Sequence, residues 1–170
     1  MMRATLQRLA GPALVLTLCS AAAAAPMPRE GSFDFNYCIA GRTSALAATG
    51  DSAAGSFEGT AGIWSNTPGG AFDGQGSHCV GSWAVIDGAY VDSGYCVTTD
   101  ADGDRFLMDF KTGPVRGDQP AMGRWVARGG SGKYAGMVAQ AEYKTVSRST
   151  PAVAGGFQVC NRNTGTYKLK

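Results

Sequence analysis

The run Asp100-Ala101-Asp102-Gly103-Asp104 places three carboxylates around one glycine. Oxygen ligands at alternate positions are typical of the start of a calcium-binding loop, because Ca²⁺ prefers several oxygen ligands. An EF-hand loop beginning at Asp100 would need a glutamate at its twelfth position, where this chain has Lys111. Asp-Gly is also typical of an exposed hairpin turn. We therefore predict a plain turn, with a weak calcium site at Asp100, Asp102 and Asp104 as the alternative and no other cofactor.

Three further side chains are candidates for acid–base chemistry. His78 is the only histidine of the chain, but no nucleophile motif accompanies it, so we expect a surface strand residue. Asp92 and Asp109 fall on the same predicted strand face as Trp83 and could act as a pair. Charged residues on an outer sheet face are usually solvated, however, and no catalytic residue is assigned.

Aromatic and sulfur-containing side chains form a stripe that we expect to face the interior of a sheet. Such a stripe usually forms packed core. Small barrels also enclose ligands at their mouths, so the same side chains are the candidate ligand-binding residues. They are Tyr37, Tyr95, Phe106, Met108 and Phe110.

Four cysteines follow the N-terminal leader, and an even number in an exported chain indicates disulfide bonds. The absence of a CxxC spacing argues against a metal–thiolate site. Asp87-Gly88 predicts a two-residue type I′ hairpin turn. Counting outward from this turn brings Cys79 opposite Cys96 in a non-hydrogen-bonded pair, where α-carbons lie roughly 4.5 Å apart. The predicted disulfides are Cys79–Cys96 and, by elimination, Cys38–Cys160.

A second Asp-Gly, at 102–103, predicts the next two-residue turn, so residues 77–111 form a three-stranded meander. The registers of the two hairpins, each assigned from its own Asp-Gly turn, agree on which face of the meander is apolar. This apolar face is expected to point inward. The predicted inner face carries Val80, Ala84, Ile86, Ala89, Val91, Tyr95, Val97, Phe106, Met108 and Phe110. The predicted outer face carries Trp83, Val85, Asp92, Thr98, Asp109 and Lys111. All four cysteines are expected on the polar faces of their strands.

The remaining segments complete an all-β fold. Residues 33–39 alternate between apolar and polar, with Phe33, Phe35, Tyr37 and Ile39 on one face. Further strands are predicted at 57–64, 122–128 and 133–146, with a final hairpin around 163–165. Segments 44–55, 67–76 and 112–120 are interpreted as strand ends and loops from their small, Gly and Pro residues. We predict a single antiparallel barrel of about eight strands, closed by the Cys38–Cys160 bond.

The N-terminal segment indicates export. Residues 1–25 have the basic start, short apolar stretch and alanine-rich end of a signal peptide, residues 26–32 are predicted to be a tail, and residues 33–170 the barrel domain. Removing Arg3 and Arg8 with the signal leaves 13 basic against 13 acidic residues. This balance, without any basic cluster, argues against a nucleic-acid or membrane partner for the mature form. The expected location is the periplasm or the extracellular space.

The run from Trp125 to Gly136, WVARGGSGKYAG, resembles a motif of the allene oxide cyclase and dirigent-like β-barrel superfamily. In that motif a strand enters a Gly-Gly-Thr-Gly turn followed by a basic residue, an aromatic, a small residue and glycine. The family often has a further glycine where this chain has Ala139. The resemblance implies a barrel with an apolar mouth and is closest in character to small exported bacterial members. No catalytic residue of the family is matched here.

The expected function is therefore non-enzymatic binding of a small apolar ligand inside an exported barrel. One alternative is a cyclase- or isomerase-like enzyme that uses tyrosine and carboxylate groups in the same pocket. The other is a homo-oligomeric interaction or structural protein, which exposure of Trp83 and Val85 on the outer face would favour.

Overall fold

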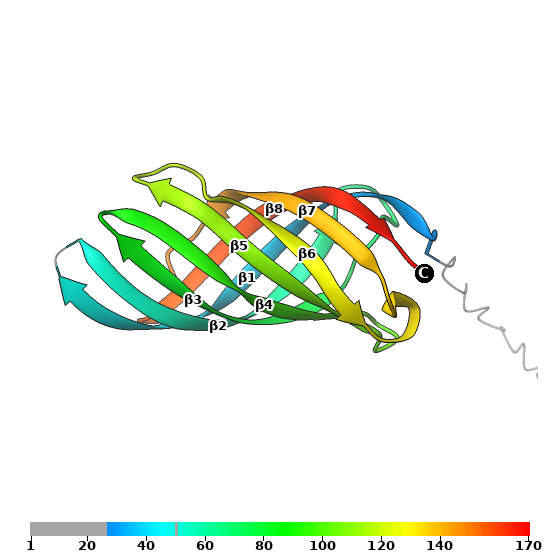
Figure 1. Ribbon diagram of the computed structural model, residues 1–170, viewed down its shortest axis with the longest axis horizontal. Coiled ribbons are helices and arrows are strands. Elements are labelled where there is room, and N and C mark those ends of the chain that lie inside the picture. The colour runs from blue at the N-terminus through cyan, green and yellow to red at the C-terminus, as the bar shows by residue number, and fades with distance from the viewer. Residues whose placement is uncertain (1–26, 50) are drawn as a thin grey trace, which may run out of the picture.

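The computed structural model, which describes residues 27–49 and 51–170, is a closed antiparallel barrel of eight strands (Figure 1). Each strand pairs with its neighbours along the chain, and the first pairs with the last to close the sheet. The elements are β1 (Glu30–Thr49), β2 (Ser52–Ser65), β3 (Gly76–Ile86), β4 (Ala89–Thr99), β5 (Arg105–Arg116), β6 (Met122–Gly130), the 3₁₀ helix η1 (Gly132–Tyr134), β7 (Val138–Arg148) and β8 (Gly156–Lys168). The predicted all-β, eight-stranded barrel is confirmed. The predicted signal peptide lies outside the described residues, and no helix within them has the length and apolarity needed to cross a membrane.

Several segments interpreted as loops or turns are strands. β1 and β2 form one long hairpin in which Ser44 pairs with Ser56 and Ala47 with Ala53, so most of 44–55 is sheet. β5 continues to Arg116, and β8 runs unbroken through the predicted hairpin at 163–165. The physical reason is that β-ladders are held by backbone hydrogen bonds. Small residues and Asn-Thr-Gly can therefore remain extended when a paired strand flanks them on each side.

The β3–β4 hairpin has the predicted register. Asp87 and Gly88 adopt φ values of 50° and 71°, as a type I′ turn requires. Cys79 pairs directly with Cys96, and the two residues form a disulfide with their α-carbons 4.0 Å apart. This prediction is confirmed.

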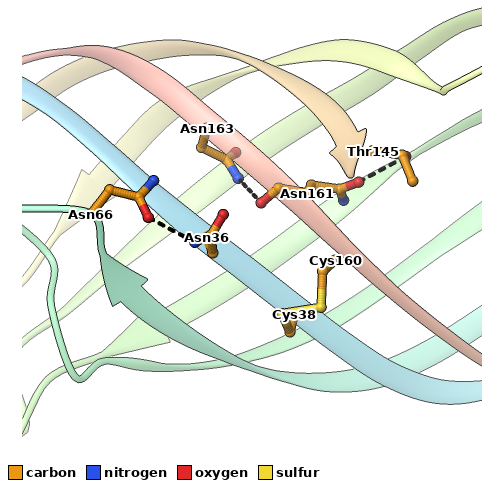
Figure 2. The surroundings of a disulfide bond; sticks show 7 residues. All are labelled: Asn36, Cys38, Asn66, Thr145, Cys160, Asn161 and Asn163. Atoms are coloured by element: carbon orange, nitrogen blue, oxygen red, sulfur yellow. Dashed lines mark hydrogen bonds between the residues drawn. A yellow bond between two sulfur atoms is a disulfide. The ribbon is translucent and has the colours of Figure 1, made fainter. Parts of the chain in front are cut away.

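The second disulfide lies on the line where the barrel closes. Cys38 of β1 is the direct partner of Cys160 of β8, and Figure 2 shows their sulfur atoms bonded between the two strands. On the same outer surface, Asn36 Nδ2 donates a 2.7 Å hydrogen bond to Asn66 Oδ1 (Figure 2). The Cys38–Cys160 disulfide joins residues separated by 122 positions, so it ties the two ends of the barrel domain together. The predicted Cys38–Cys160 pairing is also confirmed.

The predicted inner and outer faces of β3 and β4 are reversed. The turn between β4 and β5 contains five residues, Asp100 to Asp104, because Thr99 pairs with Arg105. A two-residue turn at 102–103 would place Met108 opposite Val97, whereas the actual register places it opposite Cys96. A shift of one residue exchanges the two faces of a strand. Consequently Cys79 and Cys96 point inward, with exposures of 1% and 4%.

Most positions of β3 and β4 that are expected inside point outward, whereas Ala89 is buried as expected. Tyr95 is 52% exposed, and Val80, Ile86 and Val97 are exposed as well. Tyr95 is thus a correction to the predicted interior stripe, whereas Phe106 and Met108 are buried. Of the four cysteines expected on polar faces, only Cys38 and Cys160 lie there.

One end of the barrel is filled by side chains. Phe72, from the loop between β2 and β3, is buried and packs edge-on against Phe33, with ring centroids 5.1 Å apart. Phe33 also stacks on Trp125 at 5.5 Å, and Phe106 packs on Tyr134 at 5.1 Å. Aromatic pairs in these geometries add about 0.5–1.5 kcal/mol beyond their buried area. The N-terminal end of β1 and the loops 66–75 and 131–137 therefore form a packed, closed end.

Candidate functional site

A cavity of about 630 Å³ occupies the opposite end of the barrel. It reaches the connections β3–β4, β5–β6 and β7–β8, since Gly88, Gly117 and Pro151 line it. Its walls are largely aromatic or otherwise apolar, because these side chains take the inward positions of their strands. They include Tyr37, Phe57, Trp83, Met108, Phe110 and Phe157.

A carboxylate and three hydroxyl groups form a polar cluster on one wall of this cavity. Tyr90 and Asp92 come from β4, Thr112 from β5 and Tyr143 from β7. The Tyr90 hydroxyl donates a 2.6 Å hydrogen bond to Asp92 Oδ2, and Thr112 Oγ1 donates to Asp92 Oδ1. The Tyr143 hydroxyl lies 2.6 Å from Thr112 Oγ1. Because Thr112 uses its one proton on Asp92, Tyr143 must donate to Thr112.

Both tyrosines of the cluster are held in their protonated form. Burial, reinforced by the negative charge of Asp92, raises the pKa of Tyr90 above its usual value. Burial also raises the pKa of Tyr143, although the hydrogen bond with Thr112 opposes this effect. The Asp92 side chain is therefore surrounded by hydroxyl groups that keep their protons.

A second polar group is formed by side chains of β6, β7 and β8. Thr145 Oγ1 donates a 2.8 Å hydrogen bond to Asn161 Oδ1, and the Trp125 indole donates to Asn163 Oδ1 at 3.0 Å. All four residues line the cavity. These groups are already paired with one another, so they offer a ligand few free donors.

The buried disulfide also belongs to the cavity wall. Cys79 and Cys96 line the cavity, and the Tyr37 hydroxyl lies 2.8 Å from Cys79 Sγ. Burial raises the pKa of Tyr37, although a hydrogen bond with Ser77 opposes this effect. The Cys79–Cys96 bond fixes β3 to β4 within the cavity wall, four residues along β4 from Asp92.

The structure separates the side chains that the sequence grouped together. Tyr37, Met108 and Phe110 line the cavity, Phe106 belongs to the closed end, and Tyr95 lies outside. Asp92 and Asp109 do not form a pair. Asp92 faces the cavity, whereas Asp109 accepts a hydrogen bond from Arg128 on the outer surface.

Other positions were misplaced or missed. Trp83 and Val85, expected on the outer face, line the cavity instead. Tyr90, Thr112 and Tyr143 were missed as functional candidates. Assigning the even-numbered residues of β4 to the inner face would have placed Tyr90 beside Asp92. That assignment requires the correct β4–β5 register. His78 lies on the outer surface, where its Nε2 is 2.8 Å from Glu58 Oε1.

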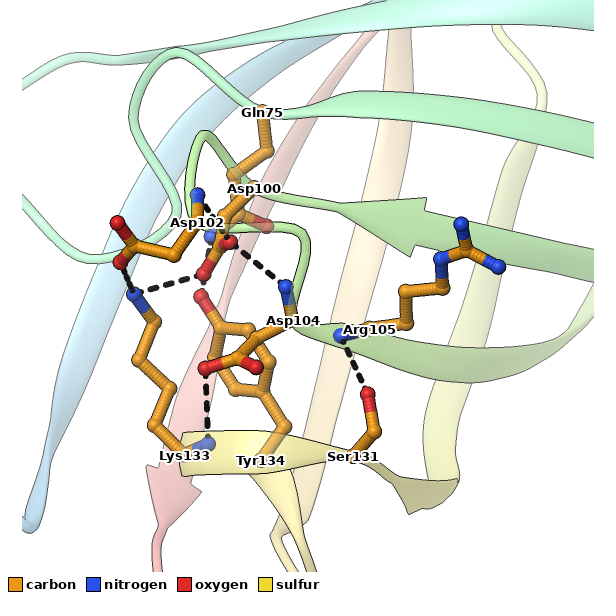
Figure 3. A network of polar contacts seen from close by, with 8 residues as sticks. All are labelled: Gln75, Asp100, Asp102, Asp104, Arg105, Ser131, Lys133 and Tyr134. Atoms are coloured by element: carbon orange, nitrogen blue, oxygen red, sulfur yellow. Dashed lines mark hydrogen bonds and ion pairs between the residues drawn. The ribbon is translucent and has the colours of Figure 1, made fainter.

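The aspartate-rich turn is occupied by a lysine of the neighbouring turn (Figure 3). Lys133 Nζ lies 2.7 Å from Asp100 Oδ2 and 2.8 Å from Asp102 Oδ2, and the Lys133 backbone N–H donates to Asp104 Oδ2 at 3.0 Å. Asp100 Oδ1 accepts hydrogen bonds from the backbone N–H groups of Asp102 and Asp104. The lysine ammonium supplies the positive charge that a calcium ion would bring. Within the described residues no group of three or more His, Cys, Asp or Glu side chains is arranged to hold a metal.

This contact predicts a measurable acid sensitivity. Burial disfavours ionised Asp100, but hydrogen bonds from Lys133, Tyr134 and the Asp104 backbone outweigh it and lower the Asp100 pKa. A folded-state pKa below the unfolded value stabilises the fold above about pH 4, and this contribution disappears as the pH falls through the lowered pKa. Asp100→Asn is expected to cost about 1–2 kcal/mol at pH 6 and much less at pH 2. Urea unfolding at both pH values tests this prediction, with Asp118→Asn as the exposed control. An equal loss at pH 6 and pH 2 would contradict it.

Comparison with known proteins identifies the fold. No protein-family model matches the chain, and no curated protein matches it in sequence. Among solved structures, the chain is similar to a pterocarpan synthase dirigent protein, with a TM-score of 0.52 over 85% of this chain and 94% of that one. The two sequences are 9% identical. The likeness shows that the chain has the fold of a dirigent protein, which is consistent with the expected dirigent-like barrel.

Proposed function

We propose that this protein binds one small, largely apolar molecule in the cavity of its barrel. The observation that supports this proposal is the cavity itself, about 630 Å³ in volume with mainly aromatic walls and one polar cluster. Sites for small molecules are typically concavities of roughly 300–1,000 Å³ lined by apolar side chains with a few placed polar groups. A barrel needed only for structure would be expected to fill both ends with side chains, as the closed end is filled.

The dirigent fold and the disulfides support the biological setting of this proposal. The structural neighbour is named a pterocarpan synthase dirigent protein, and we extend to this chain only the idea of a barrel that binds or orients a small molecule. Two disulfides indicate an oxidising, extracellular environment. We propose a periplasmic or secreted protein related to the small exported bacterial members of the allene oxide cyclase and dirigent-like superfamily.

Filling part of the cavity is expected to weaken binding. Val85 lines the cavity, so Val85→Trp should reduce affinity for the neutral fluorescent probe N-phenyl-1-naphthylamine by about 10-fold or more, equivalent to about 1.4 kcal/mol. Val97→Trp makes the same change at an exposed position of β4 and should leave affinity within about 2-fold of the original. Probe titration with the folded state checked by circular dichroism measures both. Probe binding that is absent in the original chain, or insensitive to Val85→Trp, would overturn the proposal.

The polar cluster supports a second candidate, an enzyme that transfers protons on a bound molecule. Asp92 lies in the cavity wall with the Tyr90 hydroxyl hydrogen-bonded to it. A carboxylate next to protonated hydroxyl groups can in principle accept a proton while a tyrosine stabilises developing negative charge. Conversion of a bound molecule by the original chain, lost in Asp92→Asn, would favour this candidate over simple binding.

A further inference from the structure

We propose that the cavity selects a hydrophobic organic cation, an amine with an apolar body, and that Asp92 binds its ammonium group. This inference depends on the proposed binding function and specifies the class of ligand. It starts from the charges inside the cavity. Among the described residues that line it, Asp92 is the only acidic side chain and Arg148 the only basic one.

Asp92 forms no ion pair, although the positive charge of Arg148 acts on the neighbouring Tyr90, whose pKa it lowers against the effect of burial. The ion pairs within the described part of the chain join other residues, so no Lys or Arg nitrogen lies within 4.0 Å of the Asp92 carboxylate. The contrast with Asp100 is direct, because Lys133 neutralises that carboxylate. A partly buried carboxylate that is not ion-paired attracts a cation from solution more strongly than an exposed one.

The hydroxyl groups around Asp92 occupy only some of the hydrogen-bond acceptor positions of its carboxylate. Tyr90 donates to one oxygen and Thr112 to the other. A carboxylate has about four acceptor positions, so roughly two remain for a ligand. Tyr143 donates to Thr112 and therefore fixes the orientation of the threonine hydroxyl toward Asp92. An ammonium group can donate up to three hydrogen bonds and therefore needs acceptor atoms. The free acceptor positions of the Asp92 carboxylate supply some of them, and the oxygen atoms of the neighbouring hydroxyl groups can supply others.

Aromatic rings surround the same position. Trp83 is the direct cross-strand partner of Asp92, and the Tyr90 and Tyr143 rings also line this part of the cavity. The faces of aromatic rings attract cations, most strongly the face of tryptophan, and the attraction grows when the cation is removed from water. Phe57, Phe110 and Phe157 line the cavity as well and offer an apolar surface for the rest of the ligand.

Arg148 provides the competing hypothesis. It is the last residue of β7, five positions beyond Tyr143, at the end of the strand that leads to the β7–β8 connection. If the ligand carried a negative charge, Arg148 would be its partner. Asp92 is favoured because hydroxyl donors and aromatic rings from β3, β4, β5 and β7 lie around it.

Three decyl compounds that differ in head group test the inference, each used below its micelle concentration at pH 7. Decylammonium, 1-decanol and decyl sulfate compete for the cavity with N-phenyl-1-naphthylamine. We expect decylammonium to bind about 10-fold more tightly than 1-decanol and decyl sulfate to bind most weakly. In Asp92→Asn the preference for decylammonium over 1-decanol should fall to about 2-fold or less. Asp109→Asn, which alters a carboxylate on the outer surface, should retain the full preference.

The outcomes separate this inference from the proposed function. Equal binding of decylammonium and 1-decanol, or a preference that survives Asp92→Asn, would overturn the amine inference and leave the binding function standing. Tightest binding of decyl sulfate would overturn it in favour of Arg148. Failure of the neutral probe to bind would overturn both. Circular dichroism shows whether Asp92→Asn is folded. If the variant does not fold, the order of the three head groups in the original chain decides the question.

Discussion

Gly94→Ala is expected to destabilise the barrel by about 3 kcal/mol or more, which is large for the addition of one methyl group. A Cβ atom at this position would lie 2.3 Å from the carbonyl oxygen of Val80 and 2.7 Å from the α-carbon of Gly81. Both contacts are with backbone, so relief requires β3 and β4 to move apart. The Phe110 ring lies 3.0 Å away on the third side and prevents the methyl group from tilting toward it.

The measurement is urea unfolding followed by tryptophan fluorescence and far-ultraviolet circular dichroism. Gly76→Ala is the matched control, because the nearest atom to its added Cβ is 3.9 Å away. We expect Gly76→Ala to change the unfolding free energy by less than about 0.5 kcal/mol or to stabilise slightly, through the lower entropy of the unfolded chain. Similar values for the two variants would show that the close approach of β3 and β4 at Gly81 and Gly94 is not a constraint on the fold.

The Gly94 prediction applies to a repeated arrangement. Gly81 lies under the Phe57 ring and Gly94 beside the Phe110 ring, since a Cβ at either position would meet an aromatic carbon. Phe57 and Phe110 both line the cavity. Inward glycines thus leave room for large rings from the neighbouring strand, which explains why a barrel with so many glycines still has aromatic walls.

Removing the disulfide that closes the barrel is expected to have the second large effect. In Cys38→Ala/Cys160→Ala the unfolded chain regains the freedom of a loop of 122 residues. Loops of this length correspond to a loss of about 4–5 kcal/mol in the chain-entropy model, and measured losses for native disulfides are typically about 2–5 kcal/mol. The variant should also show a larger urea m-value, because its unfolded state exposes more surface.

A matched control distinguishes loss of the cross-link from loss of side chains on β1 and β8. Ser32 and Thr166 face each other on the same two strands and are exposed, so Ser32→Ala/Thr166→Ala should change stability by less than about 1 kcal/mol with an unchanged m-value. A stability loss below about 1 kcal/mol in the cysteine variant would mean that backbone pairing alone closes the barrel. An unchanged m-value would mean that the disulfide does not act through the unfolded state.

The sequence alone determined the features that depend on local geometry. Asp87-Gly88 specified a type I′ turn, and this turn fixed the register that pairs Cys79 with Cys96. Elimination then gave Cys38–Cys160 and, with it, the closure of β1 on β8. Alternation in residues 33–39 correctly placed the aromatic side chains of β1 inside. Each of these inferences needs only neighbouring residues or a two-residue turn, for which conformational preferences are strong.

The tertiary structure decided the candidate site. The turn from Asp100 to Asp104 contains five residues, and the ammonium group and backbone N–H of Lys133, in the β6–β7 connection, contact its carboxylates. No local pattern predicts this contact. That turn sets the β4–β5 register, and a difference of one residue decides whether Asp92 or Tyr95 faces the cavity. In a strand with apolar residues on both faces, as in β4, side-chain pattern cannot choose between the two. Only closure of the barrel, which gives one face an interior and the other solvent, makes that choice.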